Sequence, residues 1–218
     1  MRLNENSVCV FDMDGTIVDT LSFWRKAPLR YLERKGITPT ADDRTFIFSH
    51  MMSESLPHLA ERYSLEDDPS EAEELLALEV LEEYRNVDVM KAGCERFLSA
   101  LRERGIPACI YTANEREFLD VIIKRFSLEL YFDHFFTCAE LGYHKGERAG
   151  FEYIARLYGK TLEDIVLFED SLYAIKNARS LGMGAVGIME EHSAHVFDEI
   201  KLNADFFVSS YDDLDILV

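Results

Sequence analysis

Two acidic residues stand two positions apart where the first apolar stretch of this chain ends. The run Val8-Cys9-Val10-Phe11 is followed by Asp12, Met13, Asp14, Gly15 and Thr16. Charged side chains are costly to bury unless something compensates them. A solvated turn that contains Asp and Gly is one explanation. The other is a reaction centre in which the two carboxylates act together.

Polar side chains also follow three other apolar runs. They are Thr112 and Asn114 after the second run, Lys145 after the third, and Glu169 with Asp170 after the fourth. Taken singly, each of them fits a turn residue, a helix cap or a surface side chain. In an open parallel sheet, however, the carboxyl ends of the strands share one edge, where ligands bind. The set as a whole therefore favours a shared site over separate accidents.

Short apolar runs alternate with helical patterns through most of the chain. The runs expected to form strands are Ser7–Asp12, Ala108–Thr112, His134–Thr137, Ile165–Phe168, Ala185–Ile188 and Asp205–Val208. The expected helices are Cys94–Arg104, Phe118–Arg125, Ala149–Tyr158 and Ser171–Leu181, and Gly105, Gly159 and Gly182 mark three of their ends. This rhythm predicts an α/β fold, a doubly wound parallel Rossmann-like sheet with helices on both faces.

Residues 20–88 interrupt this rhythm with helical patterns and no convincing strand. We expect a core domain of residues 1–19 and 89–218, with residues 20–88 inserted as a helical subdomain. Asp68 and Pro69 have the residue types of an N-cap and a first helical position. The helix that they begin is expected to bury a stripe formed by Leu75, Leu76, Leu78 and Leu81.

Composition limits the functions that this chain can have. It has 23 Lys and Arg against 41 Asp and Glu, a net charge of −18, which disfavours nucleic acid and anionic membranes as partners. No apolar run approaches the roughly 18 residues of a membrane span, and no secretory segment is visible near Met1, so we expect a cytoplasmic protein. The four cysteines lack metal-site spacing and are expected to be free thiols. The oligomeric state stays open, and a monomer is the simplest expectation.

The segment FDMDGT resembles DxDGT, the first motif of the haloacid dehalogenase-like hydrolases, a superfamily made largely of phosphatases. Ile110–Asn114 is similar to the second motif of that family, Lys145 to the third and Val166–Ser171 to the fourth. The helical insertion is similar to the C1-type cap of the phosphoglycolate phosphatase and β-phosphoglucomutase branch. One departure is Gly146, which stands where the family often has proline after the lysine.

The resemblance implies a role for each of these residues. It implies Mg²⁺ held by Asp12, Asp170 and the backbone carbonyl of Asp14, with Glu169 steadying the metal-bound waters. Asp12 would be the nucleophile that forms an aspartyl phosphate, and Asp14 the general acid and then base. Thr112, Asn114 and Lys145 would bind the phosphate of a small phosphorylated metabolite.

The inserted subdomain is expected to close over the site and to select the substrate. Trp24, Arg25 and Lys26 are the candidates for this role near the start of the insertion. Core packing fits the single tryptophan better than substrate stacking does. Arg25 and Lys26 fit surface solvation and contact with an anionic substrate equally well.

Two other functions compete with a phosphatase. In a phosphomutase of the β-phosphoglucomutase type a sugar hydroxyl accepts the phosphoryl group, but Trp24 stands where that branch has a histidine. A non-enzymatic phosphate-binding or signalling module would also combine an acidic pocket with Thr and Lys, and the long helical insertion argues against it. Dehalogenation is disfavoured because the dehalogenase branch lacks an acid at the position of Asp14.

Overall fold

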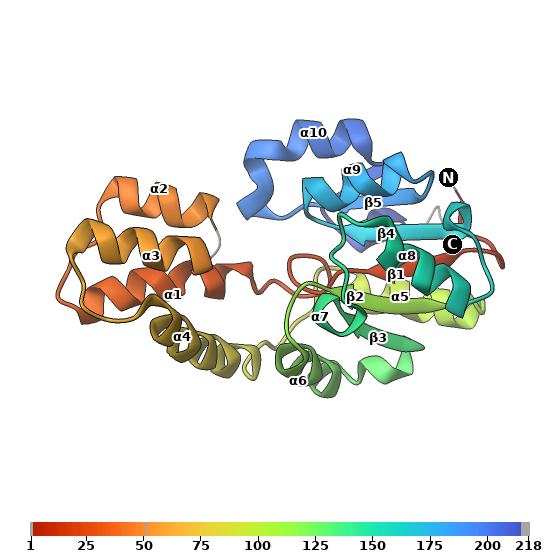
Figure 1. Ribbon diagram of the computed structural model, residues 1–218. Helices are drawn as coiled ribbons and strands as arrows, with labels where there is room; N and C mark the ends of the chain where they lie inside the picture. Colours follow the sequence, from red (N-terminus) through yellow and green to blue (C-terminus); the bar gives the residue numbers. More distant parts are fainter. Residues whose placement is uncertain (1, 51, 215–218) are drawn as a thin grey trace. The chain divides into compact units, whose positions relative to one another are not determined.

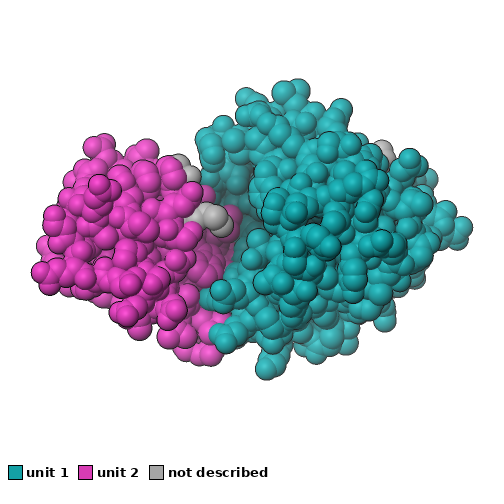
Figure 2. All heavy atoms as spheres, viewed as in Figure 1, with its two compact units in different colours: residues 1–19, 88–218 teal, residues 20–87 magenta. Residues whose placement is uncertain are grey.

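The computed structural model of this chain describes residues 2–50 and 52–214. The chain divides into two compact units, Met1–Asp19 with Asp88–Val218 and, between them in sequence, Thr20–Val87 (Figure 2). We call the first the sheet unit and the second the helical unit. Figure 1 labels strands β1 to β5 of the sheet unit and, in the helical unit, helices α1 to α4.

Six strands form the sheet within the described residues of the sheet unit. They are β1 (Val8–Phe11), β2 (Ala108–Thr112), β3 (His134–Thr137), β4 (Ile165–Glu169), β5 (Gly184–Ile188) and β6 (Phe206–Val208). Their order is β3-β2-β1-β4-β5-β6, and every neighbouring pair is parallel. Strand order therefore reverses beside β1, the type of position at which doubly wound folds bind ligands. The expected doubly wound α/β fold is confirmed.

The register of the central strands aligns their carboxyl ends. Phe11 of β1 is paired with Ile110 of β2 and with Phe168 of β4. Because the strands run parallel, Asp12 and Glu169 follow these partners at the same edge of the sheet. On the other side of β1, Thr112 ends β2 opposite Thr137 of β3.

Helices cover both faces of the sheet (Figure 1). In the sheet unit they are α5 (Cys94–Glu103), α6 (Arg116–Phe126), α7 (Cys138–Leu141), α8 (Arg148–Leu157), α9 (Leu172–Ser180) and α10 (Phe197–Asn203), with short 3-10 turns η1 (Leu128–Leu130), η2 (Leu162–Asp164), η3 (Glu191–Val196) and η4 (Tyr211–Leu214). Val8 and Val10 pack in a buried cluster with Phe151 of α8 and Ile175 of α9. Because successive side chains of a strand point to opposite faces, helices on both faces bury all of them, which explains why the central strands are continuous apolar runs.

The second face carries an aromatic cluster. Phe11 stacks on Phe168 of the neighbouring strand with ring centroids 4.2 Å apart, and it meets Phe97 of α5 edge to face at 6.5 Å. Such aromatic pairs stabilise the folded state by more than the apolar area that they bury would give.

Cys9, Cys94, Cys109 and Cys138 are free thiols, as expected. No expectation covered α7 and α10, which have 4 and 7 residues and are too short to show a helical period.

The helical unit contains α1 (Leu21–Arg34), α2 (Ala41–Ser49), α3 (Met52–Tyr63) and α4 (Pro69–Tyr84). Leu29, Leu32, Ile47 and Leu59 form a buried cluster shared by α1, α2 and α3. As expected, Asp68 caps α4 by accepting a hydrogen bond from the Ser70 amide, and Pro69 follows it.

The expected apolar stripe of α4 is wrong in part. Leu76 and Leu81 are buried, but Leu75 is 64% exposed and Leu78 58% exposed. The buried face instead joins Leu76 to Ala72, Val80 and Tyr84. These residues lie at intervals of four, so they form one row along the helix, and Leu75 and Leu78 point away from that row.

Within residues 2–50 and 52–214, every helix is too short or too polar to cross a lipid bilayer.

A buried carboxylate ties α2 to α3 in the helical unit. Asp43 accepts hydrogen bonds from the Thr40 amide at 2.7 Å, the Thr40 hydroxyl at 2.6 Å and the Tyr63 hydroxyl at 2.6 Å. Burial alone would raise the pKa of Asp43, but these hydrogen bonds and the charge of Arg62 outweigh burial and hold it below its ordinary value. The ionised form is therefore the one that the fold stabilises.

We expect Asp43→Asn to lower the free energy of unfolding by about 1–3 kcal/mol at neutral pH, because the neutral amide loses the charge that these hydrogen bonds and Arg62 stabilise. Since the folded-state pKa is depressed, the difference from wild type should shrink as pH falls through that pKa. Denaturant titration of both proteins measures it. Asp42→Asn, at an exposed position in the same helical turn, is the matched control; equal losses in the two variants would contradict the prediction.

Candidate active site

The loop after β1 holds Asp12 and Asp14 in a tight turn. The Asp12 amide still belongs to the sheet, since it donates to the Phe168 carbonyl at 3.0 Å. The chain then reverses at Gly15, whose φ of 76° lies in the left-handed region that favours glycine. The Gly15 amide donates to the Val18 carbonyl at 2.7 Å and closes the turn. Both acids therefore stay at the carboxyl edge of the sheet.

Three carboxylates from two strands meet at this edge. Asp12, Glu169 and Asp170 each offer an oxygen, and these oxygens all lie within 4.8 Å of one another. The three residues, which we call the acidic cluster, are only 5%, 1% and 5% exposed. Their proximity follows from the pairing of β1 with β4, because Phe11 and Phe168 lie opposite each other directly before them.

Lys145 supplies a buried positive charge to the acidic cluster. Its Nζ lies 2.6 Å from Asp12 Oδ1 and 2.6 Å from Glu169 Oε2, and the residue is 2% exposed. Lys145 stands between α7 and α8, and its carbonyl accepts a hydrogen bond from Asn177 Nδ2 of α9 at 2.9 Å. One ammonium beside three carboxylates leaves negative charge uncompensated if all of them are ionised.

The pKa values at the site reflect this imbalance. Burial, and then the charge of Glu169, raise the pKa of Asp12 to about 7 against the opposing effect of Lys145. Burial, Glu169 and Asp12 likewise raise the pKa of Asp170 well above its ordinary value. Burial would also raise the pKa of Glu169, but the charge and hydrogen bond of Lys145 help to hold it below its ordinary value. The cluster therefore lacks positive charge, which a bound cation would supply.

Both carboxylate oxygens of Glu169 are engaged. Oε2 faces Lys145, while Oε1 accepts hydrogen bonds from the Ser171 hydroxyl at 2.7 Å, the Ser171 amide at 3.1 Å and the Asp170 amide at 3.2 Å. Lys145 is held in turn: burial would lower its pKa, but the carboxylates of Asp12 and Glu169 raise it well above its ordinary value. It therefore stays a cation.

Thr112 and Asn114 bring the end of β2 to the same loop. Thr112 is 1% exposed, and its hydroxyl accepts a hydrogen bond from the Asn114 amide at 3.1 Å. The side-chain amide of Asn114 donates to Asp14 Oδ2 at 3.0 Å. The second acid of the opening motif is thus linked to the strand that lies beside β1.

Three polar residues at this site had no role predicted from the sequence, although Ser171 lies in the segment similar to the fourth motif. Ser171 orients Glu169, Asn177 holds the Lys145 backbone, and the Ser193 hydroxyl lies 3.4 Å from Asp170 Oδ2. A serine directly after two acids at a helix start gave a usable signal for Ser171. The other two are contacts between distant segments, and no local pattern marks them.

The candidates in the helical unit make contacts within that unit. Trp24 Nε1 donates to the Tyr84 hydroxyl at 2.8 Å, and the two rings meet edge to face. The Arg25 guanidinium donates to the Phe48 carbonyl, and Lys26 is exposed. A role of Trp24, Arg25 and Lys26 in selecting the substrate stays a prediction.

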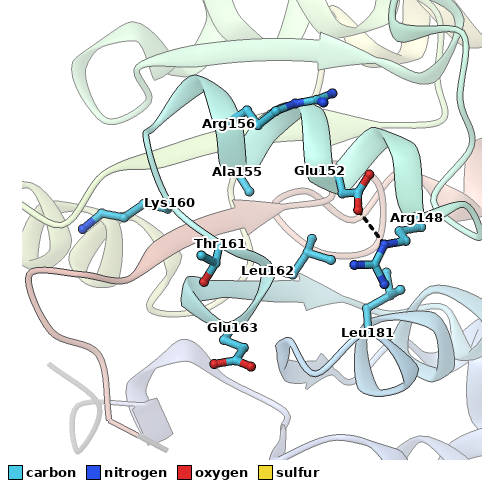
Figure 3. Close-up of a pocket in the computed structure, with 9 residues that line it drawn as sticks. All are labelled: Arg148, Glu152, Ala155, Arg156, Lys160, Thr161, Leu162, Glu163 and Leu181. Atoms are coloured by element: carbon cyan, nitrogen blue, oxygen red, sulfur yellow. Dashed lines mark hydrogen bonds and ion pairs between the residues drawn. The ribbon is translucent and has the colours of Figure 1, made fainter.

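A cavity of ≈ 520 Å³ lies elsewhere in the sheet unit. Its lining comes from α8, from the turn before β4 and from the end of α9, and it includes no residue of the acidic cluster. Figure 3 shows Arg148 paired with Glu152, while Arg156 and Lys160 point in different directions. Since its cations do not converge, this cavity lacks the features of an anion site, and the acidic cluster is the stronger candidate.

Comparisons with known proteins identify a family and similar folds. A family model described as haloacid dehalogenase-like hydrolase matches residues 7–182. The fructose-1-phosphate phosphatase YqaB of Escherichia coli is 27% identical over 191 residues, covering 82% of this chain and 94% of that protein. A Thermotoga maritima structure named for β-phosphoglucomutase has a TM-score of 0.79 at 21% identity, covering 97% of this chain and 98% of its own. Bacillus subtilis YfnB, bound to magnesium, gives 0.75 at 18% identity, covering 100% and 99%.

Lys145→Met tests the electrostatic balance of the site without any substrate. Methionine fills much of the same space but leaves the buried carboxylates without their counter-charge, so in a metal chelator we expect a loss of about 3–5 kcal/mol of unfolding free energy. Lys176→Met removes an exposed ion pair with Glu199 and should cost less than about 1 kcal/mol. Denaturant titration compares the two variants, and similar small losses would show that Lys145 does not balance the acidic cluster.

Proposed function

The chain belongs to the haloacid dehalogenase-like hydrolases, and we propose that it is a Mg²⁺-dependent phosphatase that acts on a small phosphorylated metabolite through an aspartyl phosphate on Asp12. The observation that carries this proposal is the acidic cluster, buried beside Lys145 where strand order reverses. The family and its phosphatase relatives make the chain a phosphoric monoester hydrolase. YqaB acts on a sugar phosphate, so we place sugar phosphates first among the substrates.

The donors at the site fit Mg²⁺. Asp12, Glu169 and Asp170 offer only oxygen ligands, and Mg²⁺ is usually held by one or two carboxylates together with water and phosphate. We assign Asp12, Asp170 and the backbone carbonyl of Asp14 as its ligands. Glu169 has both oxygens engaged by protein donors, which suits an indirect role through metal-bound water. When bound, Mg²⁺ would offset the charges of the carboxylates and of the substrate phosphate.

Asp12 is the nucleophile in this proposal. Its carboxylate oxygen forms a bond to phosphorus as the bond from phosphorus to the leaving oxygen breaks, which leaves the phosphoryl group on Asp12. Water then attacks this phosphorus, inorganic phosphate leaves and the Asp12 carboxylate is restored. The short contact between Asp12 and Lys145 supports the role, because it fixes one carboxylate oxygen and helps to keep the group ionised.

Asp14 moves the protons. It donates a proton to the leaving oxygen in the first step and takes a proton from the attacking water in the second. The hydrogen bond from Asn114 supports this assignment, since it fixes one oxygen of Asp14 in the loop that follows the nucleophile.

Thr112, Asn114 and Lys145 would bind the phosphoryl oxygens. Thr112 ends β2, Asn114 lies in the turn after it, and Lys145 approaches from the segment before α8, so the donors come from different elements around the same edge. Hydrogen bonds from fixed donors to an anion strengthen as its charge grows in the transition state. The cap role of residues 20–88 and a cytoplasmic location stay predictions from the sequence, and the oligomeric state stays open.

Asp12→Asn should abolish phosphate release, because an amide is not a competent nucleophile. We expect a drop of at least about 10³-fold with p-nitrophenyl phosphate and with a panel of sugar phosphates, while the variant unfolds cooperatively like the wild type. Asp198→Asn, at a side chain that is 99% exposed, is the control and should keep full activity. Near wild-type turnover by Asp12→Asn would overturn the mechanism, and isomerised sugar phosphate without phosphate release would indicate a mutase.

Asp170→Asn separates metal binding from catalysis. In the wild type, Mg²⁺ at about one hundred times its dissociation constant should raise the unfolding free energy by about 2.7 kcal/mol. The variant should lose this gain, yet be at least as stable as the wild type without metal, because one of the repelling carboxylates is gone. Thermal unfolding with and without Mg²⁺ measures both effects. An unchanged Mg²⁺ effect in Asp170→Asn would place the cation elsewhere.

A further inference from the structure

The C-terminal turn η4 places one tyrosine against both strands that carry the acidic cluster. The ring of Tyr211 lies 6.4 Å, centroid to centroid, from Phe11 and 6.4 Å from Phe168, stacked on both. Phe11 directly precedes Asp12, and Phe168 directly precedes Glu169. Tyr211 is 1% exposed, so its ring is a fixed part of the packing beneath the site.

The hydroxyl of Tyr211 reaches the loop that contains Asp14. It donates a hydrogen bond to the Thr16 carbonyl at 3.1 Å, between residues 195 positions apart in the sequence. Thr16 is fully buried, and within the described residues its own hydroxyl has no hydrogen-bond partner. The Thr16 carbonyl is therefore an attachment of the loop to the body of the sheet unit, two residues after Asp14.

Main-chain bonds hold Tyr211 and this loop to a common segment. The Tyr211 amide donates to the Ala92 carbonyl at 2.9 Å, and the Ser210 hydroxyl donates to the same carbonyl at 3.1 Å. The neighbouring Lys91 amide donates to the Ile17 carbonyl at 2.8 Å. Two donors thus hold the loop, the Lys91 amide at the Ile17 carbonyl and the Tyr211 hydroxyl at the Thr16 carbonyl.

We propose that the Tyr211 hydroxyl is a positioning group that holds the Asp14 loop in the geometry needed to protonate the leaving oxygen. The inference rests on the proposed function, in which Asp14 is the general acid. Tyr211 does not touch the substrate in this account. It acts through the Thr16 carbonyl, whose hydrogen bond limits how far the turn around Gly15 can rotate.

The leaving group provides a readout that a purely structural role would not move. p-Nitrophenolate is weakly basic and departs with little help from an acid, whereas the alkoxide of an alkyl or sugar phosphate needs a proton as the bond breaks. Displacement of Asp14 should therefore slow the hydrolysis of an alkyl or sugar phosphate more than that of p-nitrophenyl phosphate. The ratio of the two kcat/KM values isolates departure of the leaving group, because kcat/KM includes only the steps up to phosphoryl transfer to Asp12 and excludes hydrolysis of the aspartyl phosphate.

The experiment compares Tyr211→Phe with the wild type on glycerol 2-phosphate and p-nitrophenyl phosphate. Phenylalanine keeps the ring and removes only the hydroxyl. We expect the ratio of kcat/KM for glycerol 2-phosphate to that for p-nitrophenyl phosphate to fall about tenfold, a fraction of the full effect of a general acid. Tyr211→Leu, which also lacks the hydroxyl, should show the same fall.

Tyr158→Phe is the matched control. The Tyr158 hydroxyl also donates to a backbone carbonyl, that of Ala108 at 3.4 Å, but at the start of β2. This variant should keep the wild-type ratio, with any loss of stability followed by thermal unfolding. An unchanged ratio in Tyr211→Phe, or an equal fall in Tyr158→Phe, would overturn the inference and leave the phosphatase assignment intact. A wild type that hydrolyses neither substrate would instead contradict the proposed function.

Discussion

Three carboxylates share a buried edge of the sheet with one lysine, and the rest of the site is arranged around the repulsion among them. Lys145 contacts Asp12 and Glu169 at 2.6 Å, yet burial and the neighbouring acids still raise the pKa of Asp12 and Asp170. Buried carboxylates with too little positive charge nearby destabilise a fold, because each charged carboxylate disfavours the ionisation of the others. It is a suitable receptor for a cation that arrives together with a phosphate, and this favours a catalytic role for the acidic cluster.

The fold explains how residues more than 150 positions apart come together here. β1 lies between β2 and β4, and the register of these pairs brings the residues after Phe11 and Phe168 to one edge. Burial on both faces keeps the strand ends rigid, and polar partners such as Ser171 and Asn114 then fix individual oxygens. Rigid placement is what a phosphoryl-transfer site needs, because positioning and electrostatics supply most of its catalysis.

The sheet and the polar strand ends could be predicted because the central strands β1, β2 and β4 are buried apolar runs that stop at a polar residue, as at Asp12, Thr112 and Glu169. The buried row of α4 was partly mispredicted, because leucines lie on more than one face of this helix and the sequence does not show which face is buried. Leu75 lies on a face that is exposed. The contact of Ser193 with Asp170 depends on the three-dimensional path of a turn, and no local pattern in the sequence encodes it.

A crystal structure with Mg²⁺ and orthovanadate would show whether the acidic cluster binds metal and phosphoryl group together, because vanadate imitates the transferring phosphoryl group. We expect one Mg²⁺ ligated by carboxylate oxygens of Asp12 and Asp170, with vanadium beside the free oxygen of Asp12 and the amine of Lys145 directed at the same ligand. A metal bound away from these carboxylates, or a vanadate lodged elsewhere on the sheet unit, would contradict it.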